Sequence, residues 1–480
     1  MNEKNKRLLN NTFLFLLGNI GSKFIQFILV PLYTYTLSTA EYGITEIVLT
    51  AINFLFPVFS MSIADGFLRF GLSKDYDKDK ITSICIKITM VGSIISIICT
   101  PLLNINSTLS TYMIFFLTIL NLRMYRDLLS IRLKVLDKNK MYAIDSILYT
   151  FSLCISNVIM LIVLKQGING YFISYIVANI ISIIFLMCNS EYKLKSLTEK
   201  SDKETTKKLI KYSLPMIINA IAWWITTAAD KFMLQYMMND SAVGIYSIAT
   251  KVPTFVTTFT GVFNQAWIIS SVIEFDNDRE KKFYSNTFKK YVGLLFWGTT
   301  FMICIIKPFI KVYVSPEYFE AWKYAPVLLI SATASGIAAF MVGIYAAFMK
   351  NINITVTTVI GGVLNIILNY ILIDKIGIMG AAVATYISWL VIAIARIIDS
   401  KKFFDFKIDI KKLIIYNILT IIQAICIVVL NNWIGEIIAV AIFMIIAIKE
   451  REIFTEIIKI IKSKLLKKEK RKNEQIKEKV

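Results

Sequence analysis

Charged residues inside long apolar runs are the positions of this sequence best suited to chemistry. Lys23 stands in the middle of the apolar stretch from residue 11 to residue 36, with Asn19 and Gln26 about one helical turn away on either side. A charged side chain at the centre of a bilayer costs roughly 2.5–3.5 kcal/mol on insertion scales. Lys23 is therefore expected to face other protein segments or a water-filled cavity, as part of a buried polar stripe.

Further cations lie within or at the ends of other apolar runs, and they come from both halves of the chain. They are Arg69, Arg123, Arg126, Lys231 and Lys251. Arginine binds phosphate as a planar fork and lysine as a point charge, so this set suits an anionic substrate such as a phosphate or a pyrophosphate. Together with Lys23 these cations are the candidate substrate-binding residues. Asn19 and Gln26 join them as possible partners of sugar hydroxyls.

Acidic residues are scarce in the apolar runs, and three of them are candidates for coupling transport to an ion: Asp65, Asp127 and Asp230. Asp65 precedes Arg69 by four residues, and Asp127 follows Arg123 at the same spacing. Residues four apart share one helix face, so each pair is equally open to interpretation as a structural ion pair. The sequence alone leaves both interpretations open.

The elements that must position these residues are apolar runs of membrane-spanning length. The chain has 480 residues, of which 56% are hydrophobic. About fourteen runs are long enough to cross a bilayer, which predicts an all-α polytopic membrane protein. The runs are 10–36, 43–67, 82–105, 111–131, 142–164, 170–188, 209–237, 243–272, 288–310, 322–348, 353–373, 378–398, 412–430 and 433–448. Pro57 and Pro215 fall inside two of them and are expected to kink their helices.

The net charge of +20 is concentrated in alternate connections between the runs. This is the positive-inside pattern, and it places both termini in the cytoplasm. It also accounts for the basic composition without nucleic acid as a partner. The segment after Lys449 continues as a basic amphipathic helix, which is suited to anionic lipids of the inner leaflet.

Two halves of the chain resemble each other at a nearly constant offset. Tyr42-Gly43-Ile44 matches Val243-Gly244-Ile245, and Lys23 stands at the same offset from Trp224. Trp224 is therefore a further candidate substrate-binding residue, as an aromatic platform opposite the charge. The predicted organisation is a lobe of six helices over 1–190, a cytoplasmic linker at 191–211, a second six-helix lobe over 209–400, two further helices at 401–448 and the cytoplasmic tail at 449–480.

Catalysis is not expected. The sequence has no nucleotide-binding motif, no soluble block large enough for a catalytic domain, no histidine and no C-x-x-C spacing. We therefore expect no cofactor and no metal site.

Two blocks of residues resemble a known family. Asn11, Gly18, Pro31-Leu32-Tyr33, Leu37-Ser38 and Glu41-Tyr42-Gly43 are similar to the opening of the polysaccharide transporters of the multidrug/oligosaccharidyl-lipid/polysaccharide exporter superfamily. The second block, Asp230-Lys231 followed by Val243-Gly244-Ile245-Tyr246 and Lys251, resembles the family's most specific pattern. Arg69-Phe70 resembles its Arg-aromatic pair.

The resemblance implies a flippase that moves an undecaprenyl-pyrophosphate-linked oligosaccharide from the inner to the outer leaflet by alternating access. It also implies Lys23, Arg69, Lys231 and Lys251 as cavity residues, a bacterial or archaeal cell membrane as the location, and polysaccharide polymerase machinery as a possible partner. Two alternatives stay open: a cation-coupled drug antiporter of the same superfamily, and a membrane-embedded polymerase or glycosyltransferase. The first would require acidic cavity residues, and the second usually has a large outer loop.

Overall fold

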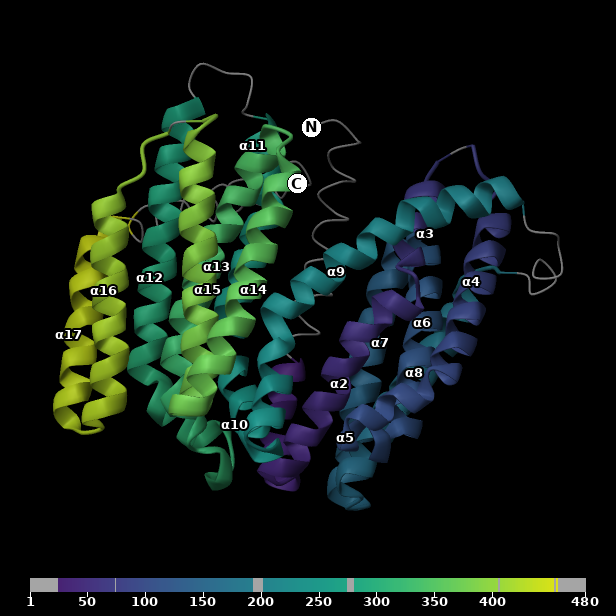
Figure 1. Cartoon of the computed structure of the whole chain (residues 1–480), viewed down its shortest axis with the longest axis horizontal. Helices are drawn as coiled ribbons and strands as arrows, with labels where there is room; N and C mark the ends of the chain where they lie inside the picture. The colour runs from purple at the N-terminus through teal and green to yellow at the C-terminus, as the bar shows by residue number, and fades with distance from the viewer. Residues whose placement is uncertain are drawn as a thin grey trace, which may run out of the picture. The chain divides into compact units, whose positions relative to one another are not determined.

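The computed structural model describes residues 25–73, 75–192, 202–273, 280–404, 406–452 and 455. Within these ranges every regular element is a helix, and each predicted apolar run coincides with helix in its described part (Figure 1). Nine of the described helices are long and apolar enough to cross a membrane. The predicted class, an all-α polytopic membrane protein, is confirmed.

The helices follow one another with short connections. After a first described helix, Ile25–Thr36, they are α2 (Thr39–Phe59), α3 (Ile63–Gly71), α4 (Lys78–Ile98), α5 (Ser107–Thr111), α6 (Met113–Val135), α7 (Asn139–Asn157), α8 (Gly167–Asn189), α9 (Lys203–Met237), α10 (Asp240–Lys251), α11 (Thr254–Ile273), α12 (Glu280–Tyr313), α13 (Ala321–Ala347), α14 (Asn351–Ile376), α15 (Ile378–Lys401), α16 (Ile410–Ile425) and α17 (Trp433–Lys449). Single turns of 3₁₀-helix occupy Thr100–Ile105 and Pro316–Tyr318, and π-helical turns occupy Val158–Val163 and Cys426–Leu430.

The start and the end of α2 follow from local sequence. Ser38 and Glu41 form a capping box, in which the Ser38 amide donates to the Glu41 carboxylate at 2.8 Å and the Glu41 amide donates to the Ser38 hydroxyl at 3.3 Å. Pro57 lies in the last turn, and Met61 and Ser62 have positive φ angles just beyond it. The predicted run 43–67 is therefore two helices, α2 and α3, separated at residues 60–62, just after the turn that contains the proline.

A second predicted run, 243–272, is also divided. Pro253 has no backbone N–H to continue a helical ladder, so α10 ends at Lys251 and α11 begins at Thr254. This break leaves Lys251 in the last turn of a short helix rather than in the middle of a long one.

Two glycines allow α2 and α10 to approach at backbone distance. A Cβ atom on Gly43 would collide with the carbonyl oxygen of Asp240, and one on Gly244 would collide with the carbonyl oxygen of Thr39. The contact is reciprocal, because each glycine faces a carbonyl oxygen near the other glycine. Thr39 and Asp240, and Gly43 and Gly244, are separated by the same offset as the other matches between the two halves. Only glycine leaves room for such an approach, and it fixes the position of α10 along α2.

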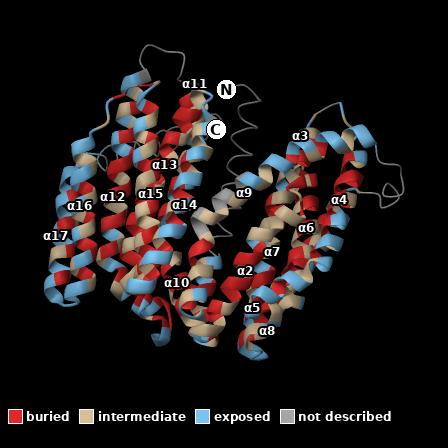
Figure 2. Cartoon of the chain, in the orientation of Figure 1, coloured by how far each residue is buried: buried red, intermediate tan, exposed pale blue. Residues whose placement is uncertain are grey.

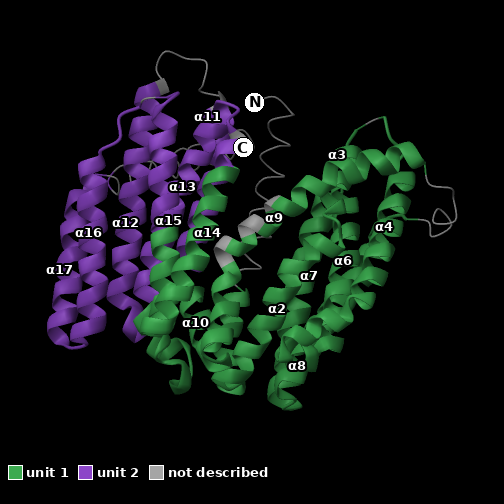
Figure 3. Cartoon of the chain, in the orientation of Figure 1, with its two compact units in different colours: residues 1–251, 310–324, 355–388 green, residues 252–309, 325–354, 389–480 purple. Residues whose placement is uncertain are grey.

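The chain divides into two compact units, shown in different colours in Figure 3. Unit 1 comprises residues 1–251, 310–324 and 355–388, and unit 2 comprises 252–309, 325–354 and 389–480. Buried and exposed residues occur on the same helices in both units (Figure 2). The lobe boundaries predicted from the sequence stay a prediction.

The core of unit 1 is apolar, with one buried arginine beside it. Ile63, Phe67, Cys85 and Leu128 pack together from α3, α4 and α6. Arg132 of α6 is 1% exposed, and it donates to the Thr82 hydroxyl at 2.6 Å, the Asp79 carboxylate at 2.6 Å and the Ser190 carbonyl at 2.8 Å. A buried charge is tolerated when all its donors are satisfied, so Arg132 fastens α6 to α4 and to the end of α8.

The core of unit 2 is built on aromatic rings. Trp267 stacks on Phe340 with ring centroids 4.2 Å apart and donates its indole N–H to the Phe340 carbonyl at 2.8 Å. Elsewhere in the unit, buried Gln423 of α16 donates to the carbonyl oxygens of Thr300 at 3.0 Å and Ala439 at 2.9 Å. These bonds tie α12, α16 and α17 together through one amide.

Candidate functional site

One face of α2 carries the polar residues that gather the candidate binding residues of unit 1. Glu46, Thr50 and Asn53 are spaced by four and three positions, so they lie on the same side of the helix. Each of them contacts a residue that the sequence nominated: Glu46 contacts Lys231 and Lys251, Thr50 contacts Trp224 and Asn53 contacts Arg123.

Glu46 is the centre of a small charged cluster, which we call the Glu46 cluster and which consists of Tyr42, Glu46, Lys231 and Lys251. The Lys231 ammonium lies 2.5 Å from Glu46 Oε2, and the Lys251 ammonium lies 3.0 Å from Oε1. The Tyr42 hydroxyl donates to Oε1 at 2.7 Å. The cluster therefore joins α2, α9 and α10 through one carboxylate.

The Glu46 cluster keeps an excess of positive charge. The Glu46 side chain is 8% exposed, whereas the Lys231 and Lys251 side chains are 16% and 32% exposed. One carboxylate neutralises only one of the two ammonium groups, and both remain reachable while their counterion is buried. In a medium of low dielectric constant this arrangement attracts an anion, which would compete with Glu46 for the lysines.

Glu46 is not among the candidate residues indicated by the sequence. Glu41-Tyr42-Gly43 belongs to the family pattern, but that pattern does not indicate an acid shared by two cations. The available signal was a glutamate inside the apolar run 43–67, which is as unusual there as Lys23 is in its own run.

Trp224 and Arg123 also reach α2. The Trp224 indole N–H donates to the Thr50 carbonyl at 3.1 Å, and its ring packs on Phe54 with centroids 4.3 Å apart. Arg123 donates to Asn53 Oδ1 at 2.5 Å and lies 4.7 Å above the Phe56 ring. Trp224 therefore has a packing role in this structure, and Arg123 forms no salt bridge with an acid among the described residues.

Arg126 has a different environment. It lies 3.1 Å from the buried Asp145 carboxylate and donates to the Ser182 hydroxyl at 2.6 Å. Its guanidinium also lies 3.8 Å from the centre of the Tyr149 ring. With its charge matched by a fully buried acid, Arg126 is a link between α6, α7 and α8, and its place among the candidate substrate-binding residues stays a prediction.

Asp230 is surrounded by neutral hydrogen-bond donors. It is 3% exposed and accepts from the Tyr246 hydroxyl at 2.7 Å, the Thr385 hydroxyl at 2.6 Å and the Asn369 amide at 2.6 Å. The Asn369 amide also donates to Asn365 Oδ1 at 3.0 Å, and Asn369 Oδ1 has no partner among the described side chains. A buried carboxylate with neutral partners and a spare acceptor nearby is suited to a proton or a small cation.

The remaining nominated residues are not brought together. Arg69 and Asp65 are exposed on α3, and Gln26 is exposed on the first described helix. The structural ion pairs that the sequence left open do not form within the described residues: no salt bridge joins Asp65 to Arg69 or Arg123 to half-buried Asp127. Lys23, Asn19 and the tail beyond residue 455 lie outside the described residues.

Comparison with known proteins gives a family and a fold. The model of the family described as polysaccharide biosynthesis protein matches residues 8–270. The probable low-salt glycan biosynthesis flippase Agl15 of Haloferax volcanii is 26% identical over 206 residues. That match covers 42% of this chain and 43% of the relative, so it spans less than half of either protein.

Solved structures of transporters share the fold. The inward closed conformation of the lipid II flippase MurJ superposes with a TM-score of 0.68 at 15% identity, covering 93% of this chain and 100% of that one. An inward-facing multidrug resistance MATE family transporter of the MOP superfamily gives 0.69 at 10% identity, covering 79% and 94%. At these identities the likeness concerns the fold alone.

Proposed function

This chain belongs to the polysaccharide biosynthesis protein family, and we propose that it is a flippase for a lipid-linked oligosaccharide. In this proposal the cargo is an undecaprenyl-pyrophosphate-linked oligosaccharide that moves from the inner to the outer leaflet by alternating access. The Haloferax relative, a probable glycan biosynthesis flippase, supports the same class of activity.

The observation that carries the proposal is the Glu46 cluster. Two partly exposed lysines from different helices hold one buried carboxylate and retain an unbalanced positive charge. A pyrophosphate has several anionic oxygens, so it can displace Glu46 from Lys231 or Lys251 as it arrives and return the lysines to Glu46 as it leaves. This exchange gives the site affinity for the cargo without trapping it.

The same charge balance disfavours the drug antiporter. A cationic drug would require an excess of acid. The described polar face of α2 instead carries one glutamate, Glu46, which pairs with Lys231 and Lys251, and further along it Asn53 accepts from Arg123. A cargo with a negative head group fits this face better.

We assign the energy source to ions and to the membrane potential. Asp230, with its neutral donors and the spare Asn369 oxygen, is the proposed coupling residue for a proton or a small cation. An interior-negative potential favours outward movement of an anionic head group by roughly 2.3 kcal/mol per charge per 100 mV when the charge crosses the whole field.

The remaining elements of the proposal come from the sequence. Both termini face the cytoplasm of a bacterial or archaeal cell, two six-helix lobes carry the cavity, and the basic tail at 449–480 lies on anionic lipids of the inner leaflet. Polysaccharide polymerase machinery is the proposed downstream partner.

The test is translocation in proteoliposomes that contain a fluorescent undecaprenyl-pyrophosphate oligosaccharide. Wild-type protein should make inner-leaflet cargo accessible to an external quencher, and the double variant Lys231→Gln/Lys251→Gln should slow this at least tenfold. Lys323→Gln is the matched control, because Lys323 is in an exposed pair with Glu320 and should change little. Lys23→Ala tests the cation predicted in the first run. No translocation by the wild type, or equal rates in all variants, contradicts the proposal.

A further inference from the structure

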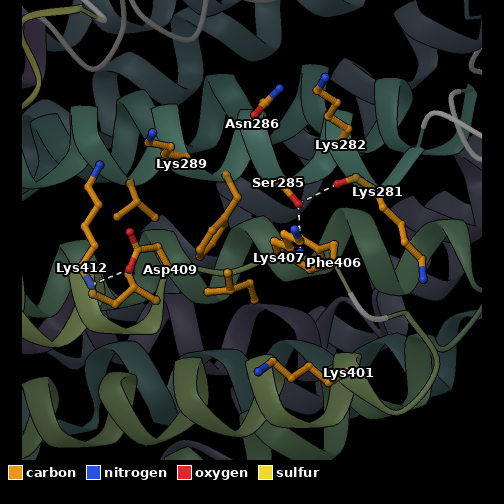
Figure 4. A pocket seen from close by; sticks show the side chains of 14 residues that line it. Lys281, Lys282, Ser285, Asn286, Lys289, Lys401, Phe406, Lys407, Asp409 and Lys412 are labelled. Atoms are coloured by element: carbon orange, nitrogen blue, oxygen red, sulfur yellow. Dashed lines mark hydrogen bonds between the residues drawn. The ribbon is translucent and has the colours of Figure 1, made fainter.

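Unit 2 contains a basic pocket at one end of its helices, far in sequence from the Glu46 cluster. The pocket has a volume of about 1010 Å³. It is lined by Lys281, Lys282 and Lys289 of α12 and, on the chain from the end of α15 to the start of α16, by Lys401, Lys407 and Lys412, all labelled in Figure 4. Asp409 is the acid that lines it.

Most of these pocket lysines have no acidic partner in the part of the chain that the structure describes. Within the described residues, the pocket lysine that pairs with an acid is Lys412, whose ammonium lies 2.5 Å from Glu450. Lys281, Lys282 and Lys289 are exposed on α12, and they have no ion pair in the described part of the chain. Several like charges around one open space are unfavourable to each other unless an anion lies between them.

The walls of the pocket are fixed by specific contacts. The Lys407 amide donates to the Ser285 hydroxyl at 3.0 Å, which ties the connection between α15 and α16 to α12. Phe406 is 1% exposed and lies against Phe288 with ring centroids 6.0 Å apart. These contacts hold the segment that carries Lys407 against α12, the helix that carries Lys281, Lys282 and Lys289.

An apolar groove of about 430 Å³ adjoins the basic pocket, and Leu413 lines both. The groove lies between α15 and α16, and its wall on α15 runs from Ile398 to Leu390. At 1.5 Å per residue this wall is about 12 Å long. Several isoleucines of the groove on α15 and α16 are exposed in the structure, with Ile394 at 47% and Ile414 at 54%.

A cationic pocket that opens into an apolar groove along membrane-spanning helices matches the two ends of a lipid. We propose that this site binds an anionic membrane phospholipid, with its phosphate head group on the lysines and one acyl chain in the groove between α15 and α16. Basic pockets between membrane helices bind anionic head groups in this manner. The inference does not depend on the proposed cargo, and with the proposed orientation the site lies in the inner leaflet.

The experiment uses the full-length protein in detergent and measures lipid binding by native mass spectrometry. The probes are phosphatidylglycerol and cardiolipin, with phosphatidylcholine as the uncharged comparison. The triple variant Lys281→Gln/Lys282→Gln/Lys289→Gln should lower the affinity for the anionic lipids at least tenfold, since each lysine near a head group contributes up to about fivefold. The matched control, Lys203→Gln/Lys207→Gln/Lys211→Gln on the exposed start of α9, removes the same charge and should change affinity less than twofold.

A second pair of variants tests the groove. Ile394→Trp fills it and should also weaken binding of the long-chain anionic lipids, whereas Ile422→Trp, exposed on α16 outside the groove, should not. Equal affinity of the triple variant and its control overturns the proposal. A second result would also overturn it: inorganic pyrophosphate binds as strongly as lipid, and Ile394→Trp does not weaken that binding. The site would then be one for a soluble anion. Preference for undecaprenyl pyrophosphate over phospholipid assigns the site to cargo and likewise overturns it.

Discussion

The exchange of Lys231 and Lys251 between Glu46 and an anion has a consequence for stability that Glu46→Gln reveals. The substitution keeps the size of the side chain and an acceptor for the Tyr42 hydroxyl, but it removes the negative charge. Two ammonium groups that now lie 2.5 Å and 3.0 Å from a carboxylate oxygen would then face each other without a counterion. The variant should therefore be less stable than the wild type and should bind pyrophosphate more tightly.

The size of the effect follows from the exposure of the groups. Removing one partner of a fully buried ion pair costs roughly 3–5 kcal/mol. The Lys231 and Lys251 side chains are 16% and 32% exposed, so water can relieve part of this cost. We expect a loss of about 2–3 kcal/mol in the free energy of unfolding for Glu46→Gln. A double-mutant cycle with Lys231→Met should give a coupling energy of about 1–3 kcal/mol.

The assay is denaturant titration of the purified protein in detergent micelles. The matched control is the surface pair of Lys323 and Glu320, whose side chains are 40% and 56% exposed. The double-mutant cycle of this pair, with Glu320→Gln and Lys323→Met, should give a coupling energy of roughly 0.2–1 kcal/mol. Equal coupling energies in the two cycles, or a Glu46→Gln variant as stable as the wild type, would show that Glu46 does not stabilise the fold by neutralising Lys231 and Lys251. Unchanged pyrophosphate binding would contradict the exchange itself.

Three further predictions concern other parts of the chain. Gly244→Ala should lower the free energy of unfolding by about 1–3 kcal/mol, because the added Cβ meets the Thr39 carbonyl. In the control Gly298→Ala the added Cβ meets nothing within 4 Å, so this variant should be neutral or stabilising. Equal unfolding curves for the two variants would contradict the close approach of α2 and α10. Arg132→Met should lower the free energy of unfolding by roughly 3 kcal/mol, because the Ser190 carbonyl and the Thr82 hydroxyl lose their donor. The control Lys140→Met, at an exposed position, should lower it by under about 0.5 kcal/mol. Unfolding of both variants at the same denaturant concentration would contradict the role of Arg132 in holding α6 to α4 and α8. Asp230→Asn should abolish the dependence of translocation on a proton or sodium gradient while the protein stays folded, and a retained dependence on both gradients would remove Asp230 from the coupling role.

The sequence predicts the helices well because the signal for a membrane span is strong and local. Every predicted apolar run coincides with helix in its described part, but two runs are divided, at residues 60–62 and at Pro253. Both breaks lie inside apolar stretches that hydropathy alone treats as continuous. The missing N–H of Pro253 separates α10 from α11, and the positive φ angles of Met61 and Ser62 separate α2 from α3.

The candidate site was predicted in part. Lys231, Lys251, Trp224 and Arg123 do meet one element, α2, although the sequence nominated them as separate contributors to a path. Glu46 links two of them, Lys231 and Lys251, and its importance depends on contacts with α9 and α10 that no local pattern encodes. Arg126 was nominated as a substrate-binding residue without its partner being known. That partner, Asp145, lies on the next helix, so residue spacing within one helix could not identify it.

We propose that a positive centre held by Glu46 selects an anionic lipid-linked glycan for transport. The most direct measurement compares translocation of two fluorescent lipids with the same oligosaccharide and the same polyprenyl chain, one joined by pyrophosphate and the other by a neutral glycosidic bond. In proteoliposomes the wild type should move the pyrophosphate lipid at least tenfold faster, and Lys231→Gln/Lys251→Gln should remove that preference. Equal rates for the two lipids in the wild type would contradict the claim.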